Sequence, residues 1–153
     1  MLFEIADSWA AHKMIKPNKR ELIYLACPYT HPTPDVRAER FHQATKAAAA
    51  LIRQGYIVFS PITMTHPIDI EMAGADNTLG ADFWVAFDET FMERCDVFVL
   101  LPLEGWQESK GVRREIEYFR IAGKPLMVLN HDYSFKSLLS PAETGARKRQ
   151  AIG

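Results

Sequence analysis

Residues Val97–Leu101 read VFVLL, a run of five apolar side chains with no polar residue among them. Apolar side chains on both faces are typical of a strand at the centre of a parallel sheet that helices cover on both sides. Further short apolar runs, bordered by Pro or Gly, have the composition of strands, namely Leu22–Cys27 (LIYLAC), Tyr56–Ser60 (YIVFS) and Pro125–Leu129 (PLMVL). We expect Pro125–Leu129 to be the last strand.

Segments with a helical spacing of apolar residues separate these strands. Helices are expected over Asp35–Gln54, Ala81–Arg94 and Ser109–Ala122, and a Gly follows the first and the last of them as a C-terminal cap. Residues 61–80 contain two Pro and two Gly and are expected to form a long loop with one helical turn. The alternation predicts an α/β domain, flavodoxin-like or Rossmann-like, with a parallel sheet of four or five strands and helices on both faces.

Length and composition predict one domain with flanking segments. The 153 residues, 48% of them hydrophobic, suffice for a single core. We expect an N-terminal extension at 1–20, an α/β domain at 21–139 and a polar, basic tail at 140–153. The chain has 18 basic and 19 acidic residues, so it has no net positive charge to attract a nucleic acid polymer, and no such partner is expected. No apolar run approaches the roughly 18 residues of a membrane helix, so no membrane partner is expected.

Two further features bear on the compartment and on the class of site. The two cysteines lack metal-ligand spacing and suit a reducing environment, and residues 1–10 carry no basic segment of the kind that begins a secretory signal. A cytoplasmic protein without a metal or other cofactor is therefore expected. The phosphate-binding motifs G-x-G-x-x-G and G-x-x-x-x-G-K-[ST] and the nucleophile motif G-x-S-x-G are absent.

The segment Ser109–Glu115 (SKGVRRE) follows the expected central strand, and ligands of an open parallel sheet bind beyond the carboxyl ends of its strands. Ser109 is expected to cap a helix whose free N–H groups favour an anion. Gly111 and Glu115 lie four residues apart on one helix face, so the absent side chain leaves a hollow beside Glu115 that is large enough for a sugar ring. The alternative interpretation is a partly buried Glu held by an arginine.

A second carboxyl group, that of Asp88, falls four residues after Trp84 and four before Met92, on the apolar side of its expected helix. A carboxyl group among aromatic side chains has a raised pKa and can act as an acid near neutral pH. The alternative is an Asp that hydrogen-bonds to the backbone. Asp96 lies at the opposite end of the sheet and is expected to be structural.

Further candidates lie near the strand ends. Tyr24 either orients a carboxylate or is a core residue with a satisfied hydroxyl. His66 is either a ligand contact or a turn residue, and Trp106 either stacks on a base or covers the core. Pro28 and Tyr29 directly follow the first strand, at the edge where a ligand binds, and are candidate substrate-binding residues.

Several short motifs together resemble those of a known family. They are Ile23-Tyr24-Leu25-Ala26, the pair Asp88…Asp96 before an apolar strand, Ser109-x-Gly111-x-x-x-Glu115, and Ala122-Gly123-Lys124-Pro125. Over residues 22–129 the chain resembles the nucleoside 2-deoxyribosyltransferase superfamily, including its hydrolytic branch, the 2′-deoxynucleoside 5′-monophosphate N-glycosidases. The segments YLACPYTHP, FSPITMTHPI and GW-x-x-S-x-G-x-x-R-E are similar, more narrowly, to a small bacterial and phage family usually placed in this superfamily.

The resemblance implies an enzyme that cleaves the N-glycosidic bond of a nucleoside or its 5′-monophosphate, by hydrolysis or by transfer to another base. Glu115 occupies the position of the nucleophile, Tyr24 that of the residue that orients it, and Asp88 that of the acid on the leaving base. Ser109 and Gly111 match positions that contact the nucleotide. The transferases usually carry an acidic residue where Ser109 stands, so the resemblance favours a 5′-phosphate, which a carboxylate would repel.

The resemblance also implies a homodimer or higher homo-oligomer and no cofactor. Pro28-Tyr29-Thr30-His31 stands where the hydrolytic branch has a phosphate loop rich in Ser and Gly. A second hypothesis is a non-catalytic nucleotide-binding module or sensor on the same fold, which release of a nucleobase would exclude. A third, an FMN-binding flavodoxin-like protein, lacks support because no Ser/Thr-rich phosphate loop follows the first strand.

Overall fold

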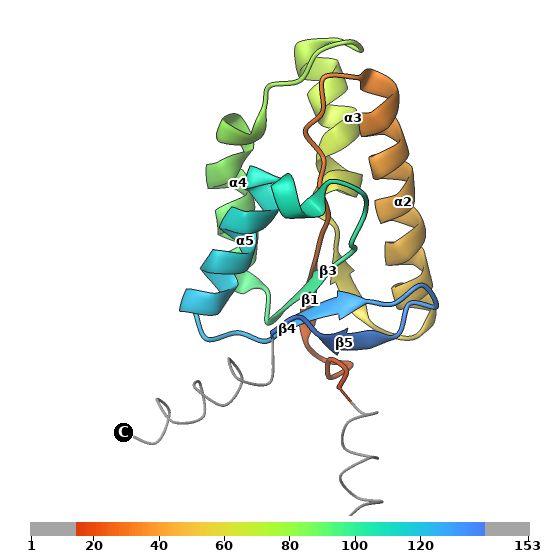
Figure 1. Cartoon of the computed structure of the whole chain (residues 1–153), viewed down its shortest axis with the longest axis vertical. Coiled ribbons are helices and arrows are strands. Elements are labelled where there is room, and N and C mark those ends of the chain that lie inside the picture. Colours follow the sequence, from red (N-terminus) through yellow and green to blue (C-terminus); the bar gives the residue numbers. More distant parts are fainter. Residues whose placement is uncertain (1–14, 140–153) are drawn as a thin grey trace, which may run out of the picture.

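The computed structural model describes residues 15–139 (Figure 1). The strands in this range are β1 (Leu22–Ala26), β2 (Ile57–Phe59), β3 (Val97–Leu100), β4 (Leu126–Leu129) and β5 (Phe135–Ser137). They form one sheet in the order β2-β1-β3-β4-β5. β1 pairs in parallel with β2 and β3, and β3 pairs in parallel with β4, so β3 is the central strand as its sequence predicts. The flavodoxin-like or Rossmann-like α/β fold is confirmed.

Helices cover both faces of this sheet. They are α2 (Pro34–Arg53), α3 (Pro61–Ala73), α4 (Ala81–Arg94), α5 (Lys110–Ile121) and the short 3-10 helix η1 (Trp106–Glu108). In Figure 1, α2 and α3 lie on one side of the sheet and α4 and α5 on the other. Successive side chains of β1 alternate between these sides: Ile23 and Leu25 pack with α2, whereas Tyr24 and Ala26 pack with α4 and α5.

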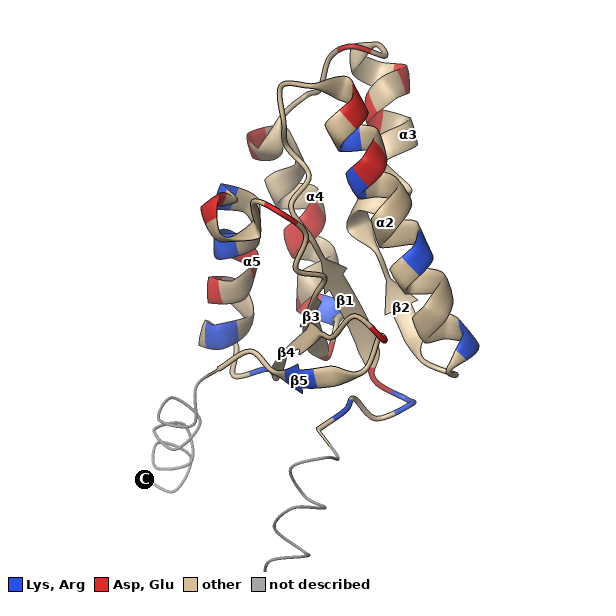
Figure 2. Ribbon diagram, turned by 45° about the vertical axis from the view of Figure 1, so that its right-hand side comes forward, with Lys and Arg blue, Asp and Glu red and all other residues tan. Residues whose placement is uncertain are grey.

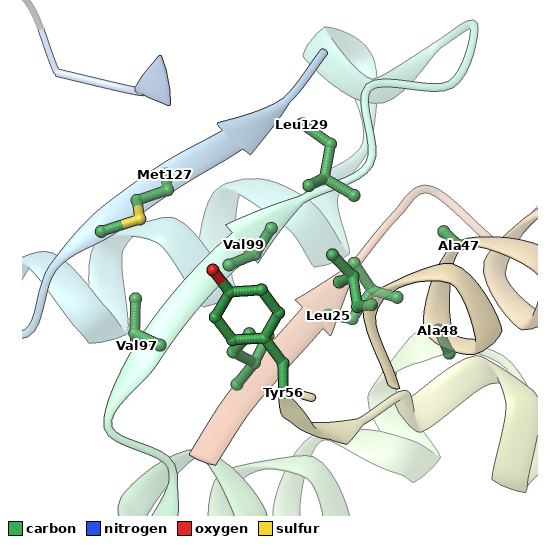
Figure 3. Packing of buried hydrophobic residues seen from close by; sticks show 10 residues of the cluster. Leu25, Ala47, Ala48, Tyr56, Val97, Val99, Met127 and Leu129 are labelled. Atoms are coloured by element: carbon green, nitrogen blue, oxygen red, sulfur yellow. The ribbon is translucent and has the colours of Figure 1, made fainter. Parts of the chain in front are cut away.

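The core on the α2 side is built from aliphatic side chains of neighbouring strands. Figure 3 shows Val97 and Val99 of β3 beside Leu25 of β1, with the ring of Tyr56 packed against them. Neither β1 nor β3 contains a charged residue, and Figure 2 shows that the helices carry most of the Lys, Arg, Asp and Glu residues. A charged group close to the sheet therefore needs a specific explanation.

The expectation of a long loop at 61–80 is wrong, because residues 61–73 form α3. Pro61 stands in the first turn of this helix, where its missing N–H leaves no hydrogen bond unmade. Pro67 lies inside the helix on its exposed side. The opposite side of the helix packs against the core through Ile62, and this packing opposes the roughly 3 kcal/mol that an interior proline costs. Only residues 74–80 form the connection to α4.

The strand β5 was not expected, and it corrects the prediction that Pro125–Leu129 is the last strand. β5 pairs antiparallel with β4 through a turn in which Asn130 N donates to Ser134 O at 2.8 Å. Its three residues are too short to show a period of two, and only Phe135 is partly buried, against Tyr56. A hairpin of this size is recognised only when its partner strand is in place.

The structure also bears on three smaller predictions. Asp96 has the structural role expected of it, because its Oδ2 accepts a hydrogen bond from Leu22 N at 2.7 Å and ties the starts of β1 and β3 together. The predicted tail at 140–153 and residues 1–14 of the predicted extension lie outside the described residues. Within residues 15–139, no helix is long and apolar enough to cross a membrane.

Exposed apolar side chains follow one side of α3 at helical spacing. Met64, Ile68 and Met72 are exposed by 42%, 38% and 57%. Leu103 and Trp106 are partly buried and pack against the core. The homo-oligomer stays a prediction, which light scattering against the monomer mass of 17.4 kDa checks.

Lys124 closes the C-terminal end of α4, and this contact leads to a stability prediction. Its Nζ donates to the carbonyl oxygens of Met92, Glu93 and Cys95 at 3.0, 2.8 and 2.7 Å. Because a cation at a helix C-terminus also interacts favourably with the helix dipole, Lys124→Met should lower the free energy of unfolding by about 1–3 kcal/mol. Urea denaturation measures this difference. The matched control Lys46→Met, on the exposed side of α2, should change it by less than about 0.5 kcal/mol, and an equally small effect at Lys124 would contradict the prediction.

Candidate active site

A cavity of about 340 Å³ lies beyond the carboxyl end of β1, between α3, α4 and α5. Its volume is at the lower end of the range of about 300–1,000 Å³ that is common for small-molecule sites. The wall on the α4 side is one helix face, and the wall on the α5 side is the first turns of that helix. The lining residues are Cys27, Tyr29, Thr30, Pro61, Ile62, Thr65, Thr78, Gly80, Ala81, Trp84, Val85, Asp88, Met92, Glu108, Ser109, Lys110, Gly111, Val112, Arg114 and Glu115.

Glu115 reaches this cavity from α5 and is held by Tyr24 of β1. The Tyr24 hydroxyl donates to Glu115 Oε1 at 3.0 Å, and the Tyr24 side chain is fully buried among aromatic rings. Glu115 Oε2 is buried without a hydrogen-bond partner. The predicted pairing of these two residues is therefore present, between positions 91 residues apart in the chain.

No arginine holds Glu115 by an ion pair within the described range 15–139. Arg113 donates from Nε to Gln107 O at 3.0 Å, and Arg114 lies 3.5 Å from Asp82 Oδ1. The Arg114 side chain nevertheless lines the cavity, and its charge acts on Glu115. Within residues 15–139, no ion pair supports the alternative interpretation that an arginine holds Glu115.

Asp88, on α4, lines the same cavity as Glu115, and its charge acts on Glu115. Its Oδ1 is buried and has no hydrogen-bond partner, so the backbone does not satisfy this oxygen. Burial raises the pKa of the Asp88 carboxyl group from 3.8 to about 6. Asp88 thus has the property that its position among aromatic residues predicts, an acid strength close to neutral pH.

The Glu115 carboxyl group is an even weaker acid. Burial, and then the nearby charge of Asp88, raise its pKa to about 8, against the opposing effects of the Tyr24 hydrogen bond and the charge of Arg114. The pKa of Tyr24 is raised by its own burial, so its hydroxyl keeps its proton and remains a donor. Between about pH 6 and pH 8 the two carboxyl groups therefore share one proton.

The N-terminus of α5 forms a positively polarised wall of the cavity. Ser109 caps the helix as predicted, since its Oγ accepts from Val112 N at 3.2 Å. The backbone N–H groups of this first turn and the side chains of Lys110 and Arg114 lie along the cavity. A Cβ atom on Gly111 would meet only Ser109 Oγ, at 3.8 Å, so the space above this residue is open as expected.

Of four further predicted substrate-binding residues, only Tyr29 lines the cavity. Tyr29 lines the cavity, and its hydroxyl forms a hydrogen bond of 2.6 Å with His66 Nδ1. His66 itself is buried in α3 and stacks on Phe41, so it is neither a turn residue nor a lining residue. Pro28 is buried behind the lining, and Trp106 packs on the core cluster that contains Phe119. The structure thus places Tyr29 at the cavity and keeps Pro28, His66 and Trp106 away from it.

Trp84 and Asp69 are among the residues of this region that sequence reasoning missed. Trp84 was expected only as part of a buried stripe, but its ring lines the cavity. Asp69 was assigned to the loop, although it lies in α3 and accepts a hydrogen bond from Trp84 Nε1 at 3.1 Å. The signal was the spacing of Ile62, Thr65, His66 and Asp69, which share one helix face; Pro67 made a helix look improbable there.

Among residues 15–139, no group of three or more His, Cys, Asp or Glu side chains is placed to hold a metal ion. What the cavity offers is a carboxyl group with a free oxygen, a second carboxyl group of nearly neutral pKa, a positively polarised helix end and an indole wall.

Comparison with known proteins places the chain by sequence. A family model described as "Domain of unknown function (DUF1937)" matches residues 21–131. The match includes every residue that lines the cavity and ends before β5. No curated protein matches the chain.

Proposed function

We propose that this chain, which belongs to the DUF1937 family, cleaves the N-glycosidic bond of a nucleoside or its 5′-monophosphate with Glu115 as the nucleophile. The observation that carries the proposal is the Tyr24–Glu115 hydrogen bond of 3.0 Å, which leaves the second Glu115 oxygen without a hydrogen-bond partner on a residue that lines the same cavity as Asp88. The resemblance of the Tyr24, Asp88, Ser109, Gly111 and Glu115 motifs to the deoxyribosyltransferase superfamily supports the same roles.

The cavity walls formed by α4 and by the first turns of α5 orient the substrate. A 5′-phosphate fits the first turn of α5, where N–H groups, Lys110 and Arg114 favour an anion. The sugar ring fits the open space above Gly111, next to Glu115. The base then lies against α4, where Asp88 can reach a ring nitrogen. This arrangement supports a nucleoside 5′-monophosphate in preference to a free nucleoside.

The reaction proceeds in two balanced steps. A Glu115 oxygen forms a bond to the anomeric carbon while the bond from that carbon to the base breaks, and Asp88 transfers its proton to the base, which takes the electron pair. A water molecule then attacks the anomeric carbon and gives a proton to Asp88, and the ester bond to Glu115 breaks. If a second base replaces the water, the same site performs transfer instead of hydrolysis.

This mechanism requires the shared proton to reside on Asp88 and the charge on Glu115. In the free protein the pKa values of about 6 and about 8 place the proton mainly on Glu115. Moving this proton from Glu115 to Asp88, against a difference of about two pKa units, costs about 3 kcal/mol. Substrate binding opposes this cost, because a base above Asp88 excludes water and raises its pKa, while positive charge that develops on the sugar favours an ionised Glu115.

The shared proton gives a specific pH dependence. The value of kcat/KM should be bell-shaped, with a maximum between about pH 6 and pH 8. Below about pH 6 both carboxyl groups are protonated and the nucleophile is lost; above about pH 8 both are ionised and the acid is lost. Initial rates of base release from pH 5 to 9 measure the profile. The Asp88→Asn variant should lack the alkaline limb, and a flat wild-type profile would contradict the assignment of both residues.

The proposed function is tested by incubating the protein with nucleosides and nucleoside 5′-monophosphates and detecting free base by mass spectrometry. Release of base with formation of sugar phosphate supports hydrolysis, and base exchange in the presence of a second base supports transfer. Nucleotide binding without release of base from any of these compounds would reject the proposal in favour of a non-catalytic nucleotide-binding module.

A further inference from the structure

Asp69 is a buried acidic residue that the reaction described above does not use. Its side chain is 1% exposed, and it lies on the inner side of α3. Oδ1 accepts two hydrogen bonds, from Leu79 N at 3.0 Å and from Trp84 Nε1 at 3.1 Å. Oδ2 is buried without a hydrogen-bond partner, and none of the ion pairs found among residues 15–139 includes Asp69.

This arrangement is costly if its purpose is only to stabilise the fold. Burial of a carboxyl group without a paired cation is unfavourable, and the unbonded Oδ2 adds to the cost. A buried arginine, Arg37, is in the same region, but it donates to the carbonyl oxygens of Pro32 and Asn77. What the protein gains from Asp69 is a strong acceptor at a defined point, which holds one indole N–H and one backbone N–H.

Both groups that Asp69 holds belong to the same wall of the cavity. Trp84 lines the cavity directly, and the residues on either side of Leu79, Thr78 and Gly80, line it as well. Trp84 precedes Asp88 by one helical turn on the inner face of α4. A base that takes a proton from Asp88 must therefore lie next to the Trp84 ring.

We propose that Asp69 is a positioning residue that fixes Trp84 and the 78–80 segment as the binding wall for the planar base of the substrate. The inference rests on the proposed function. A planar heteroaromatic base packs favourably on an indole, and such contacts contribute about 1–3 kcal/mol per base in other proteins. The contact is worth this much only if the ring is already held in place, because ordering a free Trp side chain on binding costs part of the gain.

The proposal predicts that Asp69 affects binding of the base but not binding of the sugar and phosphate. The sugar and phosphate contact α5, which Asp69 does not touch, whereas the base contacts the wall that Asp69 holds. Loss of Asp69 should therefore weaken binding of a complete nucleotide and spare binding of 2-deoxyribose 5-phosphate, the same ligand without its base. A residue that only maintains the fold would affect both ligands alike.

The test compares Asp69→Ala, Trp84→Phe and the double variant by isothermal titration calorimetry with the common 2′-deoxynucleoside 5′-monophosphates and with 2-deoxyribose 5-phosphate. Asp69→Ala should raise the Kd of the nucleotides about tenfold or more and that of the sugar phosphate less than about threefold. Trp84→Phe, which keeps an aromatic ring but removes the N–H donor, should show the same selective loss. Adding Asp69→Ala to Trp84→Phe should raise the Kd of the nucleotides by a smaller factor than Asp69→Ala does alone, because the hydrogen bond to Trp84 is then already absent and only the one to Leu79 N is lost.

Two controls are a conservative variant of Asp69 and a measurement of folding. Asp69→Asn keeps an oxygen acceptor and should recover most of the nucleotide affinity, and circular dichroism monitors folding. If Asp69→Ala does not fold, Trp84→Phe decides the question, since its side chain is smaller and the acceptor remains. Unchanged nucleotide binding in Trp84→Phe, or an equal loss for nucleotide and sugar phosphate in Asp69→Ala, would overturn the proposal.

The outcomes also separate this inference from the proposed function. A wild-type protein that binds nucleotides selectively through Trp84 but releases no base would reject the glycosidase activity and retain the positioning role. A wild-type protein that releases base while Asp69→Ala and Trp84→Phe bind nucleotides normally would retain the activity and reject the positioning role. Failure of the wild-type protein to bind any of these nucleotides, together with no release of base from any nucleoside or nucleoside 5′-monophosphate, would reject both.

Discussion

The Glu115→Gln variant is expected to release free base about a hundredfold or more slowly than the wild-type protein, while it still binds the nucleotide. Gln keeps the size of the side chain and can still accept the Tyr24 hydrogen bond, but it cannot form the ester to the anomeric carbon. A hundredfold loss corresponds to about 3 kcal/mol of the activation barrier, and loss of a covalent nucleophile commonly exceeds this value. Single-turnover rates with excess enzyme measure the chemical step directly.

The matched control for this variant is Glu117→Gln. Glu117 lies on the same helix but is exposed and paired with Arg120, so the same chemical change there should leave base release within about twofold of the wild type. Equal activity of wild-type and Glu115→Gln proteins would remove Glu115 as the nucleophile. An equal loss in both variants would instead indicate a general effect of altering α5.

Stability provides an independent readout of the same variant. The folded-state pKa of Glu115 is about 8, against the usual value of 4.5 for this group, so the folded protein binds more protons than the unfolded chain between these pH values. Wild-type stability should therefore fall as the pH rises from about 5 to 8, and Glu115→Gln should escape this loss. Thermal unfolding should show a higher Tm for the variant at pH 8 and nearly equal Tm values at pH 5. A Tm difference that does not change with pH would contradict the raised pKa.

Substitution of Gly111 by Leu is expected to abolish turnover without harming the fold. A Cβ atom at this position makes only an ordinary contact with Ser109 Oγ at 3.8 Å, so the protein itself has room for a side chain. The added atoms occupy the space that the proposal assigns to the sugar ring, and displacement of a reacting group by about 1 Å can cost a hundredfold in rate. We therefore expect kcat/KM to fall by about a hundredfold or more.

The fold should respond in the opposite direction. Replacing Gly by Leu inside a helix raises helix propensity, so Gly111→Leu should have a free energy of unfolding equal to or about 0.5 kcal/mol above that of the wild type. Gly111→Ala, with one added carbon, should show a smaller loss of activity and a similar gain in stability. Urea denaturation and steady-state kinetics measure the two effects. Full activity of Gly111→Leu would show that the substrate does not occupy the space above residue 111.

Local patterns in the sequence predict most of the framework. The apolar run at 97–101 identifies the central strand, and Ser109 and the Gly after Ala122 mark the ends of α5, because strands, caps and helix periodicity depend on neighbours within a few residues. The same reasoning failed at residues 61–73. There the prolines predict a loop, and only burial of the inner face against the rest of the protein makes the helix favourable.

What the sequence determined by itself is therefore the α/β alternation, the central strand, and which carboxyl groups stand at helical positions near a strand end. Tertiary structure alone decided that Tyr24 meets Glu115 across 91 residues, that Asp69 holds Trp84 at the cavity, and that His66 and Trp106 turn away from it. The physical reason is that these contacts depend on how helices pack on the two faces of the sheet. A shift of α4 or α5 by a fraction of a turn would separate the same side chains without changing any local pattern.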